Sequence, residues 1–120
     1  MPVMTLDEFN GFCASLPKTT HVVQWGGADV WKVGDKVFAI GRSENGQGAF
    51  TFKASEIAFE VLSDSPGVRP APYLASRGLK WLQHYDEPGL SDSSLRDHIE
   101  ASYDMAKTKL TKKKRAELGL

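Results

Sequence analysis

The segment Pro66 to Leu74, with the sequence Pro-Gly-Val-Arg-Pro-Ala-Pro-Tyr-Leu, constrains this chain more than any other. Its three prolines, Pro66, Pro70 and Pro72, fall within seven residues. Each proline lacks a backbone N–H and has a fixed φ, so the segment fits neither a helix interior nor a central strand. Because a stiff segment costs little entropy to order, we expect a rigid loop that holds Tyr73 and Leu74 in a set place.

Composition is that of one domain spanning residues 1–120. No apolar run approaches the roughly 20 residues that cross a bilayer, and the first residues lack a signal-peptide pattern. We therefore expect a cytoplasmic protein with no membrane partner, and take a monomer as the default state. Cys13 is the only cysteine, which excludes an internal disulfide and a cysteine-based zinc site. No cofactor is expected.

Charge is distributed unevenly along the chain. Residues 1–104 hold 9 Lys/Arg against 14 Asp/Glu, whereas residues 105–120 hold 6 Lys/Arg against Glu117 alone. We expect residues 111–120 to be a basic, frayed tail. It is either a solvated helix end, whose cations suit the C-terminal dipole, or a contact for a polyanion, an acidic protein or the body of this chain.

The first helix is predicted from Thr5, which begins a T-x-x-E capping box with Glu8. Leu6, Phe9, Cys13 and Leu16 recur at helical spacing, and Pro17 ends the pattern. Cys13 lies on the apolar stripe and is expected to be a buried thiol rather than a nucleophile.

The remaining elements follow from alternation and turn residues. Gly34-Asp35 predicts a tight hairpin, and Ser55 and Ser91 or Asp92 are expected helix N-caps. Strands are predicted at 21–25, 29–33, 36–40, 49–53 and 79–85, with a short one at 73–74; helices are predicted from Ser55 to near Ser63 and from about 92 towards Gly119. Strands joined by short turns form antiparallel sheets. We expect a two-layer α+β fold, order α-β(4)-α-β(1–2)-α, with five to six antiparallel strands and both terminal helices on one face.

Several short motifs, in their order and spacing, resemble those of the MmcQ/YjbR family of small bacterial proteins. They are Ser15-Leu16-Pro17, the hairpin Trp31 to Ala39, Lys53, the loop Pro66 to Leu74, Lys80-Trp81 and Ser102-Tyr103. The resemblance covers about Thr5 to Leu110 and implies a fold similar to frataxin-like and secretion-chaperone-like domains. It also implies DNA binding through a proposed double wing of β-structure, without specifying contact residues.

Candidate phosphate-contacting residues form two groups in the sequence. Arg69, Arg77 and Lys80 flank the proline loop, with Arg42 near the Asn45-Gly46 loop; the second group is Lys109, Lys112, Lys113, Lys114 and Arg115. Guanidinium and ammonium groups on one surface contact nucleic-acid phosphates. Against this stands the acidic body, because small duplex-binding domains are usually basic overall.

Other site types have weaker support. The three histidines lack metal-type spacing; His98 is expected to be solvated, and His21 and His84 to lie on strands that could be adjacent. Asp97, Glu100 and Asp104 share one side of a helix, which suggests iron binding as a hypothesis. A solvated helix face is the better interpretation. No constellation meets the requirements for catalysis.

Aromatic residues offer a last candidate surface. Trp25, Tyr73 and Trp81 either fill the core, which is the favoured interpretation, or line a ligand or partner surface. We therefore expect a non-enzymatic binding protein, with duplex DNA as the first partner to test. The alternative is a protein-interaction or chaperone-like module that uses an exposed sheet face.

Overall fold

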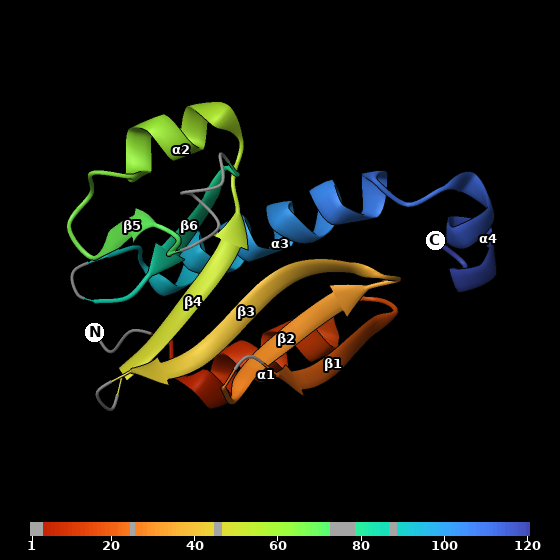
Figure 1. Ribbon diagram of the computed structural model, residues 1–120, viewed down its shortest axis with the longest axis horizontal. Coiled ribbons are helices and arrows are strands. Elements are labelled where there is room, and N and C mark those ends of the chain that lie inside the picture. Colours follow the sequence, from red (N-terminus) through yellow and green to blue (C-terminus); the bar gives the residue numbers. More distant parts are fainter. Residues whose placement is uncertain (1–3, 25, 45–46, 73–78, 87–88) are drawn as a thin grey trace.

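The computed structural model describes residues 4–24, 26–44, 47–72, 79–86 and 89–120. Six strands form one antiparallel sheet in the order β1-β2-β3-β4-β6-β5 (Figure 1). This confirms the predicted α+β class. The elements are α1 (Leu6–Ser15), β1 (Thr19–Gln24), β2 (Ala28–Val33), β3 (Lys36–Glu44), β4 (Gln47–Lys53), α2 (Glu56–Leu62), β5 (Val68–Pro70), β6 (Trp81–His84), α3 (Asp92–Thr108) and α4 (Lys112–Leu118).

Helices α1 and α3 pack on the same face of the sheet, as predicted (Figure 1). Phe9 of α1 stacks on Phe50 of β4, with ring centroids 4.8 Å apart. Gly41 of β3 leaves the room for this contact, because a Cβ there would collide with the Phe9 ring. Phe38 of β3 meets Tyr103 of α3 edge to face at 5.3 Å. These rings form the centre of one core between the helices and the sheet.

The opposite face of the sheet is covered over part of its area. Val30, Thr51 and Gln83 lie in one cross-strand row on that face, and none exposes more than 7% of its surface. The Arg69 side chain covers part of it: Nε donates to Gln83 Oε1 at 2.8 Å, and the guanidinium lies over Tyr85. In the same row, Ile40 of β3 is half-buried and Val22 of β1 is exposed, so the cover of this face decreases towards β1.

The N-terminal helix follows the sequence prediction closely. Thr5 Oγ1 accepts from the Glu8 N–H, and Glu8 Oε1 accepts from the Thr5 N–H, which completes the capping box. Cys13 is fully buried, and burial raises the pKa of its thiol well above the ordinary range. A neutral, enclosed thiol is a poor nucleophile, which supports a packing role.

The C-terminal segment differs from the prediction of one long helix with a frayed end. Helix α3 ends at Thr108, and Thr111 caps a separate helix, α4, by accepting from the Lys114 N–H at 3.0 Å. Gly119 then ends α4 in the left-handed conformation. The basic residues thus lie on a capped helix, which Figure 1 shows beyond the end of α3.

The proline segment contains a strand that the sequence did not reveal. Val68–Pro70 pairs with β6 and forms one edge of the sheet. An edge position tolerates Pro70, because the missing N–H removes no ladder bond between central strands. The strand predicted at Tyr73-Leu74 lies outside the described residues. Among the described helices, none is long and apolar enough to cross a membrane.

Ser102 joins α3 to two strands at once. Its hydroxyl donates to the Phe38 carbonyl of β3 at 2.7 Å and accepts from the Lys53 N–H of β4 at 2.9 Å. The register between β2 and β3 shifts beside Phe38, so this carbonyl lies at an irregularity of the ladder. Ser102 has no exposed surface, and water cannot replace either bond.

Replacing Ser102 by alanine is expected to lower the free energy of unfolding by about 1–3 kcal/mol, because two buried backbone groups lose their partner. Urea denaturation at constant pH measures this. Ser93→Ala, on an exposed position of the same helix, is the matched control and should change the free energy by less than about 0.5 kcal/mol. Equal effects of the two substitutions would contradict the structural role.

His84 of β6 is a second buried polar residue, but without a visible partner. It exposes 1% of its surface, and neither ring nitrogen is hydrogen-bonded to any described residue. It stacks on Phe50, and the backbone of Gly89 lies against its ring. Burial lowers the pKa of His84 below the ordinary 6.5. The backbone of Leu90, the backbone of His84 itself and, least, the nearby Asp86 charge oppose this lowering only in part.

Stability is therefore expected to fall as the pH drops below 6.5. In that range the unfolded state binds a proton at His84 that the folded state excludes. The free energy of unfolding then falls by up to about 1.4 kcal/mol for each pH unit. Urea denaturation between about pH 7.5 and pH 5 measures the effect. In His84→Leu this part of the pH dependence should disappear. A variant with the wild-type pH profile would show that His84 is not the group responsible.

Candidate nucleic-acid interface at the α3–α4 junction

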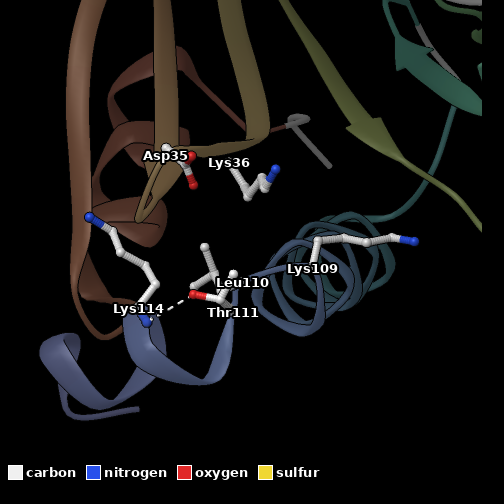
Figure 2. Close-up of a pocket in the computed structure, with 6 residues that line it drawn as sticks. All are labelled: Asp35, Lys36, Lys109, Leu110, Thr111 and Lys114. Carbon is white, nitrogen blue, oxygen red and sulfur yellow. Dashed lines mark hydrogen bonds between the residues drawn. The ribbon is translucent and has the colours of Figure 1, made fainter.

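Basic residues converge where the β2–β3 hairpin meets the junction of α3 and α4. Asp35 and Lys36 of the hairpin, with Lys109, Leu110, Thr111 and Lys114, line a hollow of about 210 Å³. Figure 2 shows Asp35 and Lys36 opposite the junction, with the ends of the Lys36 and Lys109 side chains on one side and that of Lys114 on the other. We name the cations of this region the basic end; they are Lys36, Lys109, Lys112, Lys113, Lys114 and Arg115.

Apolar contacts hold the basic end together. Gly34 forms the hairpin turn at φ +63°, and a Cβ there would lie 2.8 Å from Leu110 and 3.5 Å from Leu118. Leu110 is 5% exposed and belongs to the core, so the short connection between the two helices is anchored on the hairpin. The Thr111 cap then redirects the chain into α4. The hairpin and the basic helix are thereby fixed side by side.

The charge of this region is strongly positive. Its six cations are accompanied by two carboxylates in the same segments, Asp35 and Glu117. The ion pairs found among the described residues, His21–Asp29, Arg96–Asp92 and Lys107–Asp104, include none of the six. Lys112 and Lys113 are exposed. Cations that are not used within the fold remain available to an anionic partner.

The other predicted phosphate contacts do not join the basic end. Arg42 lies six residues along β3 from Lys36, about 20 Å away in a strand, and its guanidinium is close to Gly26. Arg69 is held by Gln83 and Tyr85 on the far edge of the sheet. The Lys80 ammonium lies 5.0 Å from the centre of the Phe59 ring. Arg77 is outside the described residues.

Of the three aromatic candidates, Trp81 is the one within the described residues. Trp81 is half-buried on β6 and does not belong to the main core cluster. It therefore fits neither the fully buried nor the fully exposed interpretation. Trp25 and Tyr73 lie outside the described residues, so the three side chains are not shown to share a surface.

The histidines and carboxylates do not gather into a site. His21 and His84 lie on strands as predicted, but three strands separate β1 from β6, so the two histidines are not neighbours. His98 is not solvated as expected: it is half-buried against Phe52, 5.5 Å between ring centres, and burial lowers its pKa. Within the described residues, no group of three His, Cys, Asp or Glu side chains could hold a metal ion.

Lys36 is the residue of the basic end that sequence reasoning missed. Its place after Gly34-Asp35 identifies it as a strand residue next to a turn, and nothing local links it to Lys109 or Lys114. The link is tertiary, through the packing of Leu110 and Leu118 on the turn. In the sequence, the only indication that this basic segment packs on another element is the presence of the apolar residues Leu110 and Leu118 within it.

An antiparallel sheet with helices packed on it defines this chain as a two-layer α+β protein. Comparison with known proteins gives its family. A family model described as YjbR matches residues 14–105, and the chain belongs to the YjbR family. The chain is similar to the crystal structure of Deinococcus radiodurans protein DR2400, with a DUF419 domain, at a TM-score of 0.85 and 22% identity. The match covers 100% of this chain and 91% of that one, and it supports the fold alone. No curated protein matches the chain.

Proposed function

We propose that this YjbR-family protein is a non-enzymatic binding protein whose basic end contacts the phosphates of duplex DNA. The observation that carries the proposal is the meeting of Lys36 from the hairpin with the lysines of α3 and α4 around one hollow. A surface built from two separate elements presents its cations over an area rather than along one line. Phosphates of a duplex backbone are spaced over such an area.

The acidic body is compatible with this role. Binding without sequence readout depends on the local density of cations and the counterions they release, not on the net charge of the whole chain. An acidic remainder would orient the molecule, because only the basic end is attracted to the duplex. No base-reading element is proposed, so we expect binding with little sequence preference.

Fluorescence anisotropy with a labelled duplex across a salt series tests the proposal. The full chain is expected to bind with a dissociation constant between about 1 and 100 µM at physiological salt. Six cations allow a log–log salt slope no steeper than about −5. Lys112→Gln/Lys113→Gln should weaken binding and flatten the slope by up to about 1.8, or about 0.9 for each lost phosphate contact. Lys36→Gln alone tests whether the hairpin takes part.

The matched control is Lys53→Gln/Lys80→Gln, which removes the same charge outside the basic end and should leave the slope unchanged. If the control flattens the slope as much as the test variant, the contact surface lies elsewhere. Absence of binding even at low salt would refute the proposal. It would favour a protein-interaction module instead, for which Ile57 and Val61, 76% and 67% exposed on one side of α2, offer one apolar surface.

A further inference from the structure

Strand β1 is an edge strand that lacks, within its six residues, the residues that natural sheets use to prevent pairing with another strand. It has the sequence Thr-Thr-His-Val-Val-Gln and pairs with β2 on one side only. Its four central residues are exposed, including Val22 at 38% and Val23 at 58%. In Figure 1, β1 forms the margin of the sheet, and no described helix or strand lies beyond it. Its outward N–H and C=O groups are therefore available for pairing.

The two edges of the sheet differ in this respect. The opposite edge, β5, has three residues and ends in Pro70, both of which limit further pairing. Strand β1 has six residues and contains no proline, lysine or carboxylate. Natural sheets use such residues to prevent pairing at their edges. Of the two edges, only β1 lacks them, so β1 is the edge open to a further strand.

Charge changes sign along β1. Thr19 pairs with Val33, and Val33 pairs with Lys36, so the first end of β1 lies two strands from Lys36. This end of β1 also follows directly on exposed Lys18. The last end of β1 lies two strands from Gly41, because Val23 pairs with Asp29 and Asp29 pairs with Gly41. Gly41 in turn meets Leu6 and Phe9 at the start of α1. The start of α1 carries exposed Asp7 and Glu8.

We propose that two copies of this chain pair through β1 in antiparallel orientation, forming one continuous sheet across a two-fold axis. Antiparallel pairing brings the Thr19 end of each strand beside the Gln24 end of the other. Lys18 and the basic end of one copy then lie at the same end of the joined sheet as the acidic start of α1 in the other, whereas a parallel arrangement would set the two basic ends together. The centre of the strand carries no lysine, arginine or carboxylate that would repel its copy, and the exposed valines gain cross-strand neighbours.

Sedimentation of the full chain from about 10 µM to about 1 mM tests the pairing. We expect a reversible monomer–dimer equilibrium. Val23→Lys places like charges near the two-fold axis and should weaken the dimer by about tenfold or more. Ile57→Lys is the matched control, because it adds the same charge at an exposed aliphatic position on α2 and should leave the equilibrium unchanged. Circular dichroism checks that both variants fold, and Thr20→Lys is a second edge variant.

Hydrogen exchange locates the interface. Amides in residues 19–24 that point away from β2 should exchange more slowly as the protein concentration rises, and the rest of the sheet should not change. A chain that stays monomeric at about 1 mM would overturn the proposal, whether or not β1 accepts a strand from some other protein. A dimer that Val23→Lys leaves intact, or whose protection lies outside β1, would overturn it as well.

Discussion

The attachment of α3 to the sheet is the constraint on which the rest of the structure depends. The Ser102 hydroxyl links β3 and β4, and one residue later the Tyr103 hydroxyl donates to the Pro17 carbonyl at 2.6 Å. These bonds tie α3 to the sheet and to the turn after α1, around the buried rings of the core. With α3 fixed there, the helix runs about 9 Å further from Ser102 to its end at Thr108, and the two residues that follow bring Leu110 onto the hairpin turn. The basic end is positioned by this geometry.

Ser102-Tyr103, Ser15-Leu16-Pro17 and the hairpin are also motifs through which the sequence resembles its family, and the structure gives them physical roles. Ser102 satisfies buried backbone groups, Tyr103 reaches Pro17, and Gly34 makes room for leucine side chains. These are contacts between elements, and they hold layers together rather than aim reactive groups at a substrate. Membership of the family is therefore informative about architecture, while the cations available for binding lie largely at or after the C-terminal end of the matched region.

Much of the fold could be predicted because its determinants are local. The Thr5 capping box, the Gly34-Asp35 turn and the apolar spacing of α3 each act within a few residues. The errors arose where a tertiary contact decides the outcome. Pairing with β6 makes a strand of Val68–Pro70, and packing against Phe52 shields His98. The division of the last helix combines a local Thr111 cap with a tertiary contact, the packing of Leu110 on the Gly34 turn. The basic end was predicted only in part for the same reason. Its lysines at 109–115 are evident in the sequence, whereas the position of Lys36 beside them depends on tertiary packing.

The most direct test of the basic end is a two-dimensional NMR titration of the full chain with a short duplex, following every backbone amide. The proposed function predicts that chemical-shift changes cluster at Lys36 and residues 109–115, two segments far apart in the sequence and adjacent at the hollow. Changes confined to the tail would remove the hairpin from the interface. Changes centred on Arg69 and Lys80, or none at low salt, would contradict the assignment of this surface to nucleic acid.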